Sequence, residues 1–124
     1  IDINGKEIIL DAYNANPTSV SNAIESFSNV KNSKAIILGD MFELGNKSLD
    51  EHRKIVELLS SKNIDNCYFI GEDFFKVKST YESFYFYRTK EDFYNSDDEI
   101  SESHILIKGS RGMKMEEIIK NKLK

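Results

Sequence analysis

Paired cysteines, long apolar runs and an excess of positive charge are all missing from this sequence. The single cysteine, Cys67, can form no internal disulfide and cannot build a zinc site without partners. No apolar run approaches the roughly 20 residues that span a bilayer, and the first residues do not resemble a signal peptide. With 17 basic and 21 acidic side chains, the net charge of −4 argues against a general nucleic-acid binder.

The length and composition fit one folded domain. The chain has 124 residues, of which 40% are hydrophobic and 31% charged, so it can form a buried core. We therefore expect residues 1–124 to form a single soluble domain, located in the cytoplasm. Because the chain starts with Ile1 rather than Met, at a position that resembles the middle of a strand, we also expect it to be a piece of a larger protein.

Apolar residues alternate between strand-like and helix-like spacing along the chain. Asn4-Gly5, a dipeptide typical of tight hairpin turns, separates the first two strand-like segments. Alternating strands and helices predict an α/β fold with a mostly parallel sheet, helices on both faces and an antiparallel hairpin at the N-terminal edge. The predicted strands are 1–3, 7–10, 34–39, 67–71, 84–87 and 104–108, and the predicted helices begin near Pro17, Ser48, Phe74, Thr89 and Ser110.

Local signals support two of these helix starts. Asn16 before Pro17 predicts a helix that Asn16 caps, because Asn is a favoured cap and Pro suits the first turn. Ser48 followed by Glu51 has the form of a capping box. The helix after Ser48 is expected to bury His52 in part. After the last strand, we expect a terminal helix with Met115 and Ile118 on its apolar face.

Ligands of open α/β sheets bind outside the carboxyl ends of the strands. Three polar loops directly follow predicted strands, and together they could form one polar rim. We name them the first loop (residues 11–17), the second loop (39–45) and the third loop (108–112).

The first loop carries the groups of a nucleotide site. Asp11, at the strand end, could accept both hydroxyls of a ribose, while Tyr13 offers a ring and Asn14 and Asn16 offer amides. A purely structural interpretation is equally open, in which Asn16 only caps a helix and Asp11 accepts hydrogen bonds from loop amides.

The second loop superficially resembles a phosphate-binding Walker A loop but does not match it. Five residues separate Gly39 from Gly45, and Lys47 does not directly follow the second glycine. Asp40 and Glu43 would repel phosphate oxygens. The chain therefore has no recognisable loop of its own for holding a triphosphate.

The third loop combines Lys108 and Arg111 with glycines and a helix start, which favours an anion. The alternative is a surface turn with two exposed bases. His52 and His104 have no metal-ligand spacing around them and are predicted to be structural, so no metal site is predicted. Cys67 is predicted to be a buried small hydrophobe.

In this order, the three loops resemble the C-terminal domain of the Mur ligases. The segments that carry the resemblance are DAYNANPTS from Asp11, LGDMFELG from Leu38 and IKGSRGM from Ile107, with His52 in the helix after the second. The resemblance spans essentially the whole chain, but it covers only one of the three domains of such a ligase. It implies a Rossmann-like domain without the central ATPase domain and the N-terminal UDP-substrate domain.

The resemblance further implies part of an ATP- and Mg²⁺-dependent ligase of peptidoglycan synthesis. The branch it resembles joins D-alanyl-D-alanine to UDP-N-acetylmuramoyl-tripeptide through an acyl phosphate. By this likeness the chain closes over ATP that the central domain holds and positions the dipeptide. Asp11, Tyr13, Asn14 and Asn16 would line the nucleotide, and Asp40, Lys108, Ser110 and Arg111 would face the acceptor or the reacting phosphate.

The segments that bind triphosphate and magnesium in this family have no counterpart here, so the isolated chain is expected to be inactive, with no catalytic residue of its own. Two other hypotheses stay open. One is a non-catalytic α/β module that binds a nucleotide or an anion, and the other is an interaction domain with an incidental polar rim.

Overall fold

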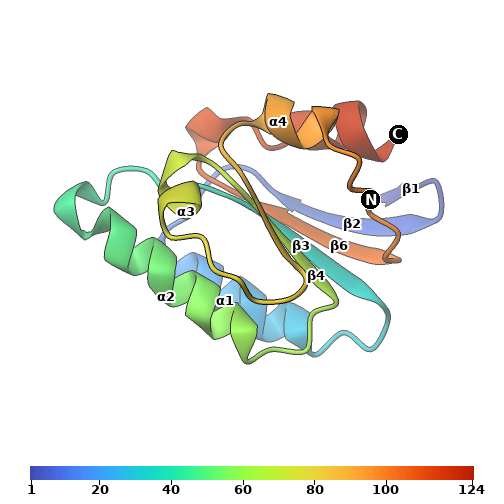
Figure 1. The fold of residues 1–124 in the computed structure, drawn as a ribbon. Helices are drawn as coiled ribbons and strands as arrows, with labels where there is room; N and C mark the ends of the chain where they lie inside the picture. Colours follow the sequence, from blue (N-terminus) through green and yellow to red (C-terminus); the bar gives the residue numbers. More distant parts are fainter.

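A computed structural model describes residues 1–124 as one six-stranded sheet with helices on both faces, as the sequence predicts (Figure 1). The strand order is β1-β2-β6-β3-β4-β5, in which only β1 and β2 pair antiparallel. The strands are β1 Asp2–Ile3, β2 Lys6–Asp11, β3 Lys34–Gly39, β4 Asn66–Ile70, β5 Phe84–Tyr87 and β6 His104–Lys108. The α-helices are α1 Pro17–Ser28, α2 Ser48–Ser60, α3 Glu72–Lys76 and α4 Lys90–Asn95.

The sheet separates two hydrophobic cores, because successive side chains of a strand point to opposite faces. On β3, for example, Ile36 and Leu38 belong to one core while Ala35 and Ile37 belong to the other. The helices α1, α2 and α3 cover the first core, and α4 and the C-terminal segment cover the second (Figure 1). Cys67 is fully buried in the first core, as expected. No helix combines the length and the apolar character needed to cross a membrane.

The structure confirms the signals at the start of the chain. Asn4 and Gly5 both have positive φ, of 54° and 81°, as the tight β1–β2 hairpin requires. Asn16 caps α1: its Oδ1 accepts a hydrogen bond from the Ser19 amide at 2.9 Å, and Ser19 Oγ accepts one from the Asn16 amide at 3.1 Å. The turn therefore positions the start of β2 beside β1, and the cap fixes where α1 begins after β2.

The cap predicted at Ser48 and the continuous terminal helix are wrong, although α2 does begin at Ser48. Ser48 is the first residue of α2 but caps nothing, because a 3₁₀ turn, Gly45–Lys47, precedes it and its hydroxyl donates to Asp73 instead. The terminal helix is also interrupted, since Lys114 takes the left-handed conformation (φ 52°) after the 3₁₀ turn Arg111–Met113. Only the π-helical turn Ile119–Leu123 follows. The predicted apolar contacts nevertheless form, because Met115 and Ile118 are fully buried.

Candidate functional site

The strand order brings the three loops together at the carboxyl ends of the parallel strands. Because β6 lies between β2 and β3, the third loop runs between the other two. The Gly109 amide donates to the carbonyl of Asp11 at 3.3 Å, and the Ser110 amide donates to the carbonyl of Asp40 at 3.3 Å. The Phe42 amide donates to Ser110 Oγ at 2.8 Å. The loops therefore form one continuous polar rim, held by backbone hydrogen bonds.

Glycine makes this close approach possible in the third loop. A Cβ placed on Gly109 would lie 2.6 Å from the side chain of Met115 and 3.3 Å from the backbone of Gly39. Met115 is completely buried against both glycines. The second and third loops thus meet at two glycines, Gly39 and Gly109, and Met115 fills the remaining space.

Asp11 and Lys108 form an ion pair within this rim. They stand opposite each other in the register of β2 and β6, and Lys108 Nζ lies 2.5 Å from Asp11 Oδ2 and 2.9 Å from the carbonyl oxygen of Asn14. The lysine side chain is only 3% exposed, whereas that of Asp11 is 45% exposed. Lys108 therefore ties the first loop to β6, and Asp11 keeps one side of its carboxylate open to a ligand.

The other predicted groups of the first loop differ in how accessible they are to a ligand. Tyr13 is 79% exposed, and Asn14 is also exposed. Asn16 uses its side-chain oxygen to cap α1, so that only its NH₂ group is open to a ligand. Tyr13 and Asn14 are thus the accessible groups next to Asp11.

The third loop also divides into a buried part and an exposed part. Ser110 is buried, and its hydroxyl accepts the hydrogen bond from the Phe42 amide. Arg111 is exposed, and its guanidinium carbon lies 6.0 Å from the centre of the Tyr13 ring. Ser110 holds the second loop in place, whereas Arg111 faces solvent beside the first loop.

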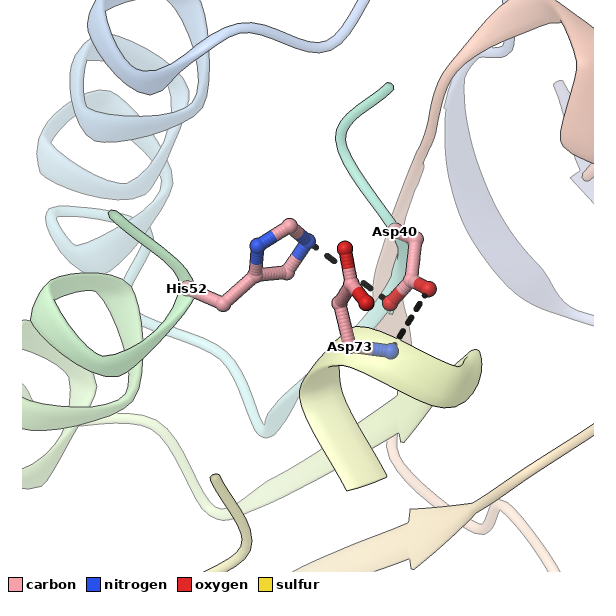
Figure 2. A group of neighbouring side chains, drawn as sticks. All are labelled: Asp40, His52 and Asp73. Carbon is pink, nitrogen blue, oxygen red and sulfur yellow. Dashed lines mark hydrogen bonds and ion pairs between the residues drawn. The ribbon is translucent and has the colours of Figure 1, made fainter. Parts of the chain in front are cut away.

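Asp40 lies just beyond β3, where it holds the start of α3 (Figure 2). Its Oδ2 accepts a hydrogen bond from the Asp73 amide at 2.9 Å, and its Oδ1 accepts one from the Phe74 amide at 3.0 Å. Burial raises the pKa of Asp40, although these two backbone hydrogen bonds act in the opposite direction. Gly71, directly before α3, has a φ of 137°, and a Cβ there would collide with the Asp40 carboxylate.

His52 is completely buried beside this carboxylate, more than the sequence predicts (Figure 2). Its Nε2 accepts a hydrogen bond from the Met41 amide at 3.0 Å, so the ring proton is assigned to Nδ1, which lies 2.7 Å from the Ser48 carbonyl. The ring therefore links α2 to the second loop. This agrees with the structural role that the sequence predicts for His52.

Asp40, His52 and Asp73 form the one group of side chains with the spacing of a metal site. Their donor set does not fit a cation, because the lone pair of His52 Nε2 is used by the Met41 amide. Asp73 accepts a hydrogen bond from Ser48 Oγ at 2.5 Å. The cluster is a hydrogen-bonded joint between the second loop, α2 and α3, and we derive no metal chemistry from it.

Sequence reasoning missed Asp73 and the role of Ser48 in this joint. Asp73 follows the end of β4, so the strand-end rule could have selected it once β4 was known to lie beside β3. The residues around Asp11 present a half-exposed carboxylate and an exposed aromatic ring, which suit ribose hydroxyls and a flat group. A nucleotide thus fits the first loop better than a metal fits the joint.

Comparison with known proteins agrees with this architecture. Residues 1–111 match the family described as "Mur ligase, glutamate ligase domain". The chain is 35% identical over 127 residues to the UDP-N-acetylmuramoyl-tripeptide–D-alanyl-D-alanine ligase of Bacillus subtilis, an alignment that covers 94% of this chain and 28% of that protein. It is 30% identical over 123 residues to the ligase of the same name from Buchnera aphidicola, covering 96% of this chain and 27% of the relative.

Solved structures show the same fold. MurF from Acinetobacter baumannii superposes with a TM-score of 0.84 at 25% identity, over 97% of this chain and 28% of that one. MurF ligase from Thermotoga maritima, solved in complex with ADP, gives a TM-score of 0.69 at 20% identity over 93% of this chain and 28% of that one. The chain thus spans little more than a quarter of the relatives it matches, and it belongs to the Mur ligase family, glutamate ligase domain.

Proposed function

We propose that this chain is the C-terminal domain of an ATP-dependent ligase that joins D-alanyl-D-alanine to UDP-N-acetylmuramoyl-tripeptide in peptidoglycan synthesis. The proposal is supported by family membership and by curated relatives that carry this activity in their names. The structural observation that carries it is the half-exposed carboxylate of Asp11, fixed at the sheet edge by the buried Lys108.

The proposed reaction forms an amide bond in two steps. ATP transfers its terminal phosphoryl group to the peptide carboxylate of the UDP-linked substrate, which gives an acyl phosphate and ADP. The amine of D-alanyl-D-alanine then attacks the acyl carbon, a proton leaves the nitrogen, and inorganic phosphate departs. Closure of a domain over these groups excludes water and brings fixed charges to the reacting atoms.

In this reaction the first loop faces the nucleotide. Asp11 accepts hydrogen bonds from the ribose hydroxyls through the side of its carboxylate that Lys108 leaves open. Tyr13 and Asn14, both exposed, line the same surface, and the free NH₂ group of Asn16 completes it. The role of Lys108 is to position Asp11 and the first loop, because its ammonium already has two protein acceptors.

The second and third loops face the acceptor side. Arg111 is the exposed cation of this surface. Asp40 and Ser110 act by holding the second loop and α3 in position, since their polar atoms already bind backbone amides. Arg111 is thus open to a ligand on this side, whereas Asp40 and Ser110 are occupied by the protein itself.

The remaining parts of the reaction are proposed to lie outside this chain. We infer that other domains of the full-length protein hold the triphosphate and Mg²⁺, because the sequence has no phosphate-binding loop and, in its one cluster with metal spacing, His52 Nε2 already accepts a hydrogen bond from the Met41 amide. The isolated chain is accordingly expected to show no ligase or ATPase turnover. The cytoplasm, which supplies ATP, is the proposed location.

Asp11 provides the test. In the full-length protein, Asp11→Asn is expected to raise the KM for ATP at least tenfold, because an amide NH₂ group cannot accept a hydrogen bond from a ribose hydroxyl. The measurement is phosphate release that depends on both D-alanyl-D-alanine and the UDP-tripeptide. Asp50→Asn, an exposed substitution on α2, is the matched control and should leave the KM unchanged.

Two results would contradict the proposal. An unchanged KM for ATP in a folded Asp11→Asn protein would remove the ribose role. Turnover by the 124-residue chain alone would refute its assignment as a dependent domain, and tight binding of an adenine nucleotide by that chain without turnover would favour a non-catalytic nucleotide-binding module instead.

A further inference from the structure

The strand β5 forms one lateral edge of the sheet and pairs only with β4. Edge strands present unpaired backbone groups to other chains, and proteins commonly protect them with charged side chains, prolines or β-bulges. β5 has none of these, because its four residues, Phe84–Tyr87, are all aromatic and pair with β4 in continuous register. Three of them, Phe84, Tyr85 and Phe86, are only half-buried. β5 is therefore an apolar edge that the chain leaves partly open to solvent.

The hydrogen bonds between β5 and β4 use only every second residue of β5. At the two ends of the strand, the carbonyls of Ser83 and Tyr87 each accept a hydrogen bond at 2.9 Å from an amide in or directly after β4. Because consecutive peptide groups of a strand point to opposite sides, those of Phe84 and Phe86 point away from β4. They lie on the side of β5 where no further strand follows.

Phe86 is the residue of this edge with both backbone groups free. The Phe84 amide already donates to the carbonyl of Tyr81 at 3.3 Å, which closes the turn before β5. The amide and carbonyl of Phe86 form no hydrogen bond with a turn, loop or cap, and they face away from the one strand that pairs with β5. A second strand at this edge would therefore find one donor and one acceptor at Phe86.

Opposite charges stand at the two ends of β5. Glu82 precedes the strand and Arg88 follows it; both are exposed, and neither forms an ion pair within the chain. The guanidinium carbon of Arg88 lies 4.6 Å from the centre of the Phe75 ring, a contact that holds the cation beside the strand end. If two such strands pair antiparallel, each acid meets a base, whereas a parallel pair would bring like charges together. The edge is thus complementary to a second copy of itself.

We propose that β5 pairs antiparallel with β5 of a second copy of this chain, about a two-fold axis beside Phe86. The Phe86 amide of each copy donates to the Phe86 carbonyl of the other, as in a hydrogen-bonded pair of antiparallel strands. Tyr85 of one copy then stands opposite Tyr87 of the other, an aromatic pair that adds to the contact. Glu82 of each copy lies near Arg88 of the other.

This contact is closed by its own symmetry, so the assembly stops at a dimer. Because β5 has only four residues, the interface is small and the dimer is expected to dissociate reversibly. The inference concerns assembly at the side of the sheet and does not rest on the proposed ligase function.

Analytical ultracentrifugation of the full-length protein gives the first test. The wild type is expected to show a monomer–dimer equilibrium. Glu82→Arg and Arg88→Glu should each raise the dissociation constant of the dimer at least tenfold, because the two-fold axis repeats every like-charge contact. The double variant, which exchanges the two charges, should return to within about threefold of the wild type. Glu57→Arg and Arg53→Glu, both exposed on α2, are the matched controls and should leave the constant unchanged.

Amide hydrogen exchange gives the second test, because it reports on the proposed strand pairing itself. Exchange at the Phe86 amide of the full-length protein should slow at least tenfold between dilute and concentrated samples. The Leu10 amide is the matched control, since it faces away from β6 at the opposite side of the sheet, beyond the end of β1. Exchange at Leu10 should not depend on protein concentration.

Three results would overturn the proposal. The first is a full-length protein that stays monomeric up to about 100 μM. The second is a dimer whose dissociation constant is the same in the charge-reversal variants, which would place the contact on another surface. The third is exchange at Phe86 that is already slow in the monomer, which would mean that another part of the full-length protein covers this edge.

Discussion

Two aspartates at the same edge of the sheet have opposite surroundings. Asp11 is the last residue of β2, and Asp40 directly follows β3. The side chain of Asp11 is 45% exposed and bound by one lysine. The side chain of Asp40 is 8% exposed and accepts hydrogen bonds from the amides of Asp73 and Phe74 in the first turn of α3. The ends of two strands in the same sheet thus carry one carboxylate that is open and one that is saturated with hydrogen bonds.

The difference comes from what lies beside each strand end. Beside Asp11 is β6, whose Lys108 stands opposite in the parallel register and supplies a single cation. Beside Asp40 is β4, which ends at Ile70 and passes through Gly71 directly into α3. Because Gly71 has no Cβ, the carboxylate can reach the amides at the helix start. A strand-end carboxylate is therefore available to a ligand only where no helix start faces it.

The largest predicted effect is on the saturated carboxylate. Asp40→Ala removes the acceptor for the Asp73 and Phe74 amides and should lower the free energy of unfolding by about 3 kcal/mol, since hydrogen bonds to charged groups contribute roughly 1.5–3 kcal/mol each and the relief of desolvation offsets part of this. Urea unfolding followed by circular dichroism measures the change.

Asp73→Ala serves as the control for that substitution, because it keeps the backbone amide that Asp40 binds and removes the contact with Ser48 together with a like charge beside Asp40. Its effect should be less than half that of Asp40→Ala. Equal losses from the two substitutions would show that the side-chain contacts of the joint, rather than the amides of α3, account for the stability.

The fold could be predicted from periodicity because each element carries its own local signal. The Asn4-Gly5 turn and the Asn16 cap depend on neighbouring residues alone, and both are confirmed. The Ser48 cap failed because the 3₁₀ turn Gly45–Lys47 runs directly into α2, which leaves Ser48 itself in a helical conformation, and its hydroxyl donates to Asp73, 25 residues away. Lys114 broke the terminal helix through a left-handed backbone conformation that apolar spacing does not reveal.

The candidate site was predictable only in part. The three loops could be found from strand ends alone, but the position of β6 between β2 and β3, which brings Lys108 against Asp11, depends on long-range pairing. The same holds for the contact of Asp40 with α3. Sequence reasoning predicted that the three loops lie together, which the structure confirms, but it could not tell which of their polar groups the protein itself occupies.

A smaller effect is expected for the open carboxylate. Asp11→Ala should lower the free energy of unfolding by about 1–2 kcal/mol, because it leaves the buried ammonium of Lys108 with only the Asn14 carbonyl, while the exposure of Asp11 limits the loss. Lys108→Met alone should cost a similar amount. In the double variant the losses should overlap, with a coupling energy of about 1 kcal/mol. Additive losses would mean that the pair does not act as a unit.

The smallest predicted effect is the dependence of stability on pH through Asp40. Burial raises the pKa of Asp40 in the folded chain above its ordinary value of 3.8, so the folded state holds this proton more tightly than the unfolded state. The free energy of unfolding of the wild type, relative to Asp40→Asn, should therefore fall as the pH rises from below 3.8 toward the folded-state pKa, and then stay level. Taking the difference between the two proteins cancels the other titrating groups. A rise over the same interval would mean that the hydrogen bonds from Asp73 and Phe74 outweigh desolvation, and that Asp40 is held as a favourable charge.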